Sequence, residues 1–194
     1  MNITIFDSAT GEIKSNVFCQ VGLANAQLSQ SEDFIAGEYS AEHFYIQSFV
    51  AVEKPSRPSK SHVFNYTTKQ WEDPRTLADL KAAKNAAINS ARLRANQSHF
   101  MFAGKQIAVD PLSRSDIDAM HGTVLMLQAM PAGWPGAWKA MDNTFVAIPD
   151  VATWGAFYGA MVAQGMQNFA HSQALKAQLD AATTPAEVEA VPVW

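Results

Sequence analysis

A change of residue pattern near Glu72 and Asp73 constrains the fold more than any other feature of the sequence. Before this point, short stretches of alternating apolar and polar residues are separated by turn-forming residues, which is typical of β-hairpins. After it, leucines and alanines recur at helical spacing. We therefore expect an α+β fold, with a small β-rich N-terminal domain over residues 1–72 and a helix–hairpin–helix–hairpin–helix C-terminal domain over residues 73–194.

The N-terminal part of the sequence predicts several short strands. Residues 3–5 and 17–21 form two of them, and residues 44–52 form a longer one. Segments 6–13 and 64–71 share the pattern Phe-(Asp or Asn)-x-x-Thr-x-x-apolar, in which a turn follows the Asx residue and precedes an apolar strand. We expect these two segments to form hairpins with similar turns.

The C-terminal part predicts three long helices and a short one. The first has Asp73 as its N-cap and Pro74 at its first position, and ends near Asn96. The second spans residues 114–130. Its apolar residues form one stripe and extend around much of the helix, so we expect it to be the most buried helix. Glycine is unfavourable inside a helix, so Gly122 predicts a tight contact there. Hairpins are expected over 100–109 and 138–148, and further caps at Ser113 with Asp116, Asp150 and Thr184.

Charge and composition limit the classes of function. Charged residues make up 16% of the 194 residues, against about 25% in an average soluble chain, which favours a surface partly covered by partner proteins. The net charge of -4 argues against nucleic-acid binding. The single cysteine, Cys19, cannot form an internal disulfide. The N-terminus has no signal-peptide pattern, and the longest apolar stretch, 124–130, is too short to span a membrane, so we expect no membrane insertion.

No constellation of residues predicts catalysis. The five histidines have no metal-binding spacing, and we expect His121 to be a packed, hydrogen-bonded side chain. Asp116 and Asp118 point in different directions if both lie on one helix. Nucleophile elbows and phosphate-binding glycine loops are missing. We therefore predict no cofactor, no metal and no enzymatic activity.

Three tryptophans are candidate interface residues. Trp134 lies in a proline–glycine loop and Trp194 is the last residue, so each either contacts another chain or packs locally. Trp138 is a third candidate because an aromatic face can hold a sugar. Trp154 is expected in the core. Gly155 and Gly159 form a G-x-x-x-G pattern that predicts close helix packing in water.

The first C-terminal helix also predicts assembly. Its alanines spread around the cylinder and would bury little area against a single core; they are Ala82, Ala83, Ala86, Ala87, Ala91 and Ala95. We therefore expect a homo-oligomer, with a trimer favoured, and this helix near the subunit contact. Ala83→Arg or Ala87→Arg is expected to weaken association more than folding.

The order of these motifs is more specific than any one of them. The residues concerned are Leu77, Lys81, Ala87, Ile88, Arg92, Phe102, Gly104, Asp110, Ser113, Ile117, Gly122, Trp138, Asp142, Asn143, Val146, Lys176 and Leu179. In this order they resemble a domain of unknown function common in tail and tail-fibre proteins of tailed bacteriophages. The N-terminal part resembles the short β-rich leaders that precede that domain.

The resemblance implies a structural component of the virion tail, associated with the baseplate or fibres and synthesised in the bacterial host cytoplasm. Such a component acts by binding other tail proteins, and the family supplies no catalytic residues. Two alternatives stay open: a tail-fibre assembly chaperone, and a receptor-binding tip that holds a glycan against Trp134 or Trp138.

Overall fold

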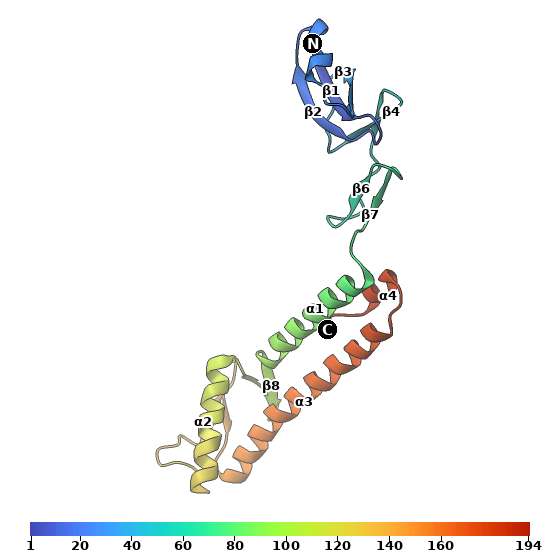
Figure 1. Cartoon of the computed structure of the whole chain (residues 1–194). Helices are drawn as coiled ribbons and strands as arrows, with labels where there is room; N and C mark the ends of the chain where they lie inside the picture. Colours follow the sequence, from blue (N-terminus) through green and yellow to red (C-terminus); the bar gives the residue numbers. More distant parts are fainter. The chain divides into compact units, whose positions relative to one another are not determined.

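The computed structural model describes all residues from 1 to 194 and shows an α+β protein with two compact units. The N-terminal unit is Met1–Arg75 and the C-terminal unit is Thr76–Trp194 (Figure 1). The division lies three residues after the boundary that the change of sequence pattern indicates.

The N-terminal unit contains a three-stranded antiparallel sheet with the strand order β2-β1-β3. Its strands are β1 (Asn2–Asp7), β2 (Ile13–Phe18) and β3 (Glu32–Ala36). Two short 3-10 helices, Val21–Leu23 and Asn25–Gln27, follow β2. The expected strand over residues 17–21 is therefore wrong in its bounds, because β2 begins earlier and ends at Phe18.

Two hairpins complete this unit. The single strand expected over residues 44–52 is wrong: these residues belong to two strands, β4 (Phe44–Gln47) and β5 (Val50–Glu53). Ser48 and Phe49 reverse the chain with positive φ angles of 51° and 60°, the combination required by a two-residue turn of type I′. The second hairpin, β6 (Val63–Asn65) with β7 (Gln70–Glu72), confirms the expectation.

The two segments with the shared pattern form the same turn. Asp7 Oδ1 accepts hydrogen bonds from the backbone N–H groups two and three residues later, and Asn65 Oδ1 does the same. Each turn ends in a residue with positive φ, Gly11 at 73° and Lys69 at 58°. The Lys69 Nζ then donates to the Thr10 carbonyl at 2.5 Å, so one turn docks on the other.

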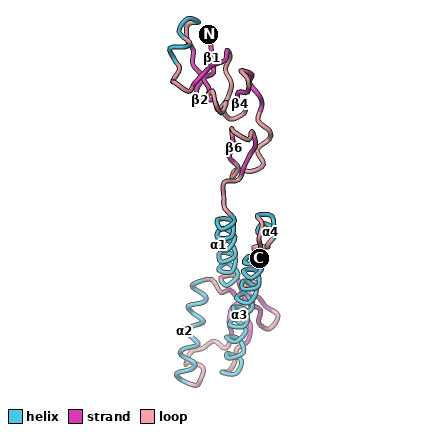
Figure 2. Tube along the Cα trace, turned by 45° about the vertical axis from the view of Figure 1, so that its right-hand side comes forward, coloured by secondary structure: helices cyan, strands magenta, loops and turns pink.

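In the C-terminal unit, α1 (Leu77–Asn96) and the long α3 (Val151–Ala181) lie side by side (Figures 1 and 2). Between them along the chain come the hairpin of β8 (His99–Phe102) and β9 (Lys105–Ala108), helix α2 (Pro111–Leu127), and the hairpin of β10 (Ala137–Lys139) and β11 (Phe145–Ala147). The short α4 (Pro185–Ala190) returns the chain to α1.

The helix caps correct two expectations. Helix α1 begins after Thr76, which forms a capping box with Asp79, while the Asp73 carboxylate instead pairs with Arg75 at 2.6 Å. Helix α2 begins after Asp110, with Pro111 at its first position. The Ser113 hydroxyl donates to Asp110, so Ser113 supports that cap and is not the cap itself. The caps expected at Asp150 and Thr184 are confirmed.

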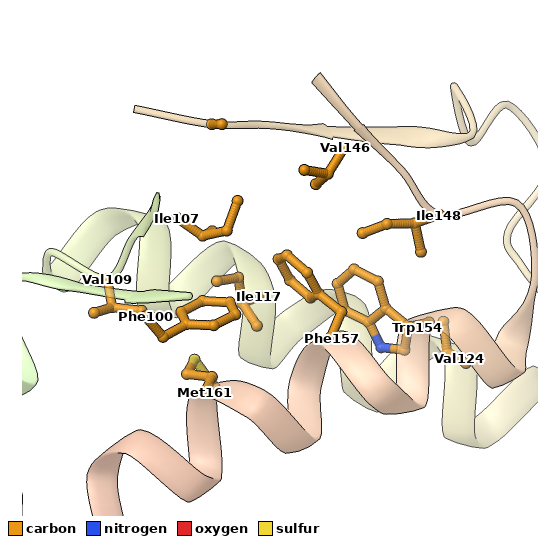
Figure 3. Packing of buried hydrophobic residues seen from close by; sticks show 11 residues of the cluster. Phe100, Ile107, Val109, Ile117, Val124, Val146, Ile148, Trp154, Phe157 and Met161 are labelled. Atoms are coloured by element: carbon orange, nitrogen blue, oxygen red, sulfur yellow. The ribbon is translucent and has the colours of Figure 1, made fainter. Parts of the chain in front are cut away.

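The main core lies around α3, which is the most buried helix. Figure 3 shows Trp154, Phe157 and Met161 of α3 facing the β8-β9 and β10-β11 hairpins and α2. Helix α2, expected to be the most buried, contributes only two buried residues. A Cβ placed on its Gly122 would meet nothing within 4 Å, so the tight contact expected there is absent.

A second core holds the C-terminal segment on α1 and α3. Its buried residues are Ile88, Leu175, Leu179, Ala182, Val188 and Val191. The Lys84 ammonium of α1 donates to the carbonyls of Glu189 and Val191 at 3.0 and 2.8 Å. These bonds close the end of α4, where backbone carbonyls have no partner within the helix.

We expect Lys84→Ala to loosen residues 185–194, because two charge-assisted hydrogen bonds are lost, with a local cost of about 1.5–3 kcal/mol. Hydrogen exchange of the full chain should show faster exchange in peptides covering 185–194. Lys105→Ala is the control, because its salt bridge to Asp142 is exposed and lies elsewhere in the unit. Equal exchange in the two variants would contradict the anchoring role of Lys84.

Candidate interaction surfaces

Two of the candidate tryptophans, Trp134 and Trp138, lie together in the C-terminal unit. Their rings are 6.1 Å apart, and each also contacts Trp154, at 5.9 and 5.7 Å between centroids. The Trp134 indole N–H donates to the Ile148 carbonyl at 2.8 Å, and the ring is half-buried. Of the two roles that the sequence left open for Trp134, the structure shows local packing.

Trp138 is partly accessible to solvent. It is half-buried and lines an open depression of about 510 Å³ together with Ser113, Lys139 and Asn143. The neighbouring turn is fixed by Asp142, which accepts from the Thr144 backbone N–H and hydroxyl. Hydrogen bonding from Lys105, and then from Thr144, lowers the pKa of Asp142 well below its usual range. The carboxylate therefore stays ionised and keeps the turn closed.

His121 has a structural role, as the sequence predicts. Its ring stacks on Tyr158 with 3.6 Å between centroids, and its Nδ1 accepts a hydrogen bond from the Trp154 indole at 3.3 Å. Burial raises the pKa of the Tyr158 hydroxyl. The histidine connects α2 to α3 and belongs to no group of three or more His, Cys, Asp or Glu side chains that could hold a metal ion.

Trp194 stays accessible at the end of the chain. Its side chain is 45% exposed and packs edge-on against His171 of α3 at 4.8 Å. Together with Ala91, Ala95 and Asn168, it lines an open hollow of about 440 Å³. Of the candidate tryptophans, Trp194 is therefore the most available to another chain.

The alanines of α1 divide between two environments. Ala91 is buried, and Ala87 is half-buried, whereas Ala83 is exposed. The exposed face of α1 also carries polar and charged side chains: Asp79, Asn85, Asn89, Ser90 and Arg94. Part of the small-residue surface is thus used by helix contacts within the chain, and the remainder is of mixed polarity.

The outer face of α3 is a surface that the sequence reasoning missed. Val162, Met166 and Phe169 are 40%, 67% and 48% exposed on it. Gly155 and Gly159 are exposed as well, and a Cβ on either would meet nothing within 4 Å. The close packing expected for these glycines therefore has no partner within the chain. Two sequence signals indicate this surface: residues 151–175 contain no Asp, Glu, Lys or Arg, and alanine recurs every seventh residue at 156, 163, 170 and 177.

None of the helices is both long enough and apolar enough to cross a membrane.

Comparison with known proteins gives one match. Neither the curated proteins nor the solved structures contain a significant match to the chain. Residues 79–192, more than half of the chain and nearly all of the C-terminal unit, match the family described as "Domain of unknown function (DUF4376)". The chain therefore belongs to the DUF4376 family.

Proposed function

We propose that this protein is a structural component of a bacteriophage tail, associated with the baseplate or the tail fibres. In this role it is synthesised in the bacterial host cytoplasm, becomes part of the virion, and acts by binding other tail proteins and copies of itself, with a trimer favoured. The phage assignment is supported by the order of motifs from Leu77 to Val146, which resembles that of tail-associated proteins.

The single structural observation that carries a binding role is the amount of exposed apolar surface on the C-terminal unit. Besides the outer face of α3, the end of α2 exposes Leu125 at 64% and Met126 at 77%. Extended exposed apolar patches mark sites of protein–protein contact. A catalytic role has no comparable support. Asp79, Asp110 and Asp150 serve helix caps, Lys105 and Arg114 form exposed ion pairs, and Lys84 holds backbone carbonyls.

Mass spectrometry of purified phage particles tests the proposal directly. We expect peptides from both units of the chain in particles purified by density gradient, at a constant ratio to a known tail protein. A host cytoplasmic protein that is lost during purification serves as the control. Particles that are complete and infectious but lack this protein would contradict the proposal.

A tail-fibre assembly chaperone is the alternative that shares most features with this proposal, because exposed apolar surface is also expected of a protein that holds an unassembled fibre. Co-expression with a fibre protein separates the two. The chaperone interpretation requires that soluble fibre forms only when this protein is present, and that mature particles lack it. The structural interpretation requires that the protein stays bound to the assembled tail.

A receptor-binding tip is favoured by one observation only. Trp138, which is partly accessible, lines a depression together with the polar residues Ser113, Lys139 and Asn143, and an aromatic ring with nearby hydrogen-bonding groups suits a sugar ring. Glycan-array binding that is lost in Trp138→Ala and kept in Trp194→Ala would favour this role over assembly.

A further inference from the structure

Helix α3 has two apolar faces, and the chain itself covers only one of them. The inner face packs in the two cores described above. The outer face is exposed along its whole length, and its residues are Ala152, Gly155, Gly159, Val162, Met166, Phe169 and Gln173. The Arg92 guanidinium of α1 lies over the Phe169 ring at 4.7 Å, yet this ring stays 48% exposed. We call this outer row the α3 seam.

The spacing of the α3 seam identifies its partner as another helix. Its seven residues are separated alternately by three and four positions, which is the a/d spacing of a heptad repeat. The exposed alanines at 156, 163, 170 and 177 occupy the next heptad position at every repeat, alongside the row. A repeat of 3.5 residues keeps one face turned toward a second helix that winds around the first. Contact with solvent imposes no such repeat.

The glycines and the missing charges are independent signs that the seam is covered. Glycine weakens a helix, and within the chain no neighbouring atom lies close enough to require it at positions 155 and 159. A solvated helix face normally carries charged residues, whereas the seam carries none. Small residues without charge permit close approach of a second backbone, and both features gain a physical reason only when another chain is present.

We propose that the α3 seam is a self-association surface, packed against the α3 seams of other copies of this protein. No residue of the α3 seam is charged, so identical seams can meet without repulsion between their own side chains. The helices of a bundle around a rotation axis each turn the same face toward that axis. This inference rests on the proposed assembly function, and it places the contact on α3, where the sequence had indicated α1.

The area of the seam argues for more than two copies. From residue 152 to residue 173 the α3 seam extends about 33 Å, and with a width of about 10 Å it offers roughly 330 Å². Stable interfaces bury roughly 800 Å² on each partner. A helix in a three-fold bundle contacts two neighbours and also buries residues beside the α3 seam, such as the exposed alanines at 156, 163, 170 and 177. A two-fold pair of seams buries only the narrow strip itself.

Sedimentation equilibrium of the full chain tests the proposal with a matched pair of variants. Met166→Glu places a carboxylate in the seam, and Gln167→Glu places the same charge on the next residue, which is exposed and outside the seam. We expect the unmodified chain to sediment as a trimer. Met166→Glu should weaken association by about 100-fold or more, because each copy would bury an unpaired charge. Gln167→Glu should change it less than about 3-fold.

A third variant, Ala83→Arg, separates this inference from a contact through α1. If Ala83→Arg dissociates the oligomer and Met166→Glu does not, the α3 seam is not the contact. A monomer at about 100 micromolar for the unmodified chain, a concentration at which association with a micromolar Kd would be nearly complete, also overturns the inference. Circular dichroism of each variant must match the unmodified chain, which is expected because Met166 is 67% exposed in the single chain.

These experiments separate failure of the α3 seam proposal from failure of the proposed function in the tail. A monomeric chain that is nevertheless found in purified particles overturns the α3 seam and leaves the tail assignment in place. A trimer that is disrupted by Met166→Glu, but is absent from particles, supports the seam and overturns the tail assignment.

Discussion

Replacing Phe157 by alanine is expected to destabilise the C-terminal unit by about 3–5 kcal/mol, the usual cost of removing a fully buried aromatic side chain. Phe157 is completely buried in the main core. Its ring contacts Phe100, Phe102 and Trp154 at 5.0, 5.2 and 5.3 Å between centroids. A single truncation therefore removes contacts to the β8-β9 hairpin and to Trp154 of α3 itself. The truncation would leave a cavity between α3 and the β8-β9 hairpin, which pack against each other in the main core.

Denaturant unfolding followed by tryptophan fluorescence measures this effect, because Trp138 and Trp154 both lie against the Phe157 ring. Protein concentration must be kept constant, since association stabilises the folded chain by mass action. Phe145→Ala is the control: that ring is 67% exposed, and we expect a loss below about 1 kcal/mol. Similar losses in the two variants would contradict the core as described.

The second large effect is expected in the N-terminal unit, from Gly11→Ala. Gly11 has a φ angle of +73°, and a Cβ there would lie 1.9 Å from the Ile46 carbonyl oxygen. The backbone of Ile46 cannot move away without losing the 2.8 Å hydrogen bond between its N–H and the Gly11 carbonyl. Steric overlap and backbone strain together should cost about 2–4 kcal/mol.

Gly104→Ala is the matched control for this variant. Gly104 has nearly the same φ angle, +75°, but a Cβ there would meet nothing within 4 Å, so only backbone strain of about 1 kcal/mol is added. Hydrogen exchange of the full chain should show the loss for Gly11→Ala in peptides from residues 1–75. Equal losses in the two variants would mean that the contact with Ile46 is unimportant.

The elements that the sequence predicts correctly are those set by local chemistry. The turn after Asp7 and the turn after Asn65 form because each side chain accepts hydrogen bonds from the next backbone N–H groups. Asp150 and Thr184 cap helices for the same local reason. In these places the residues within one turn of the chain decide the structure.

The errors arise where two local signals compete or where packing decides. Asp73 and Thr76 are both good N-caps, and the ion pair between Asp73 and Arg75 leaves the role to Thr76. The turn at Ser48 and Phe49 contains neither glycine nor asparagine, so the sequence gives no sign of the positive φ angles there.

Contacts between distant segments of the chain also decide which of the candidate surfaces are exposed, and the sequence does not predict these contacts. Trp134 is predicted in an open loop, but a single long-range hydrogen bond to Ile148 and contact with Trp154 hold it against the core. The α3 seam can be read as a heptad in the sequence. However, only the structure shows that the chain covers the opposite side of α3 and leaves this row exposed.

We propose that this protein is a structural part of a phage tail and assembles through its C-terminal unit. A cryo-electron microscopy reconstruction of the purified particle tests both points directly. We expect density for the C-terminal unit in the baseplate or fibre region, repeated around the tail axis, with Met166 and Val162 of each copy against the α3 helix of a neighbouring copy. A tail reconstruction without this chain, or one in which the outer face of α3 faces solvent and contacts no other chain, would contradict the proposal.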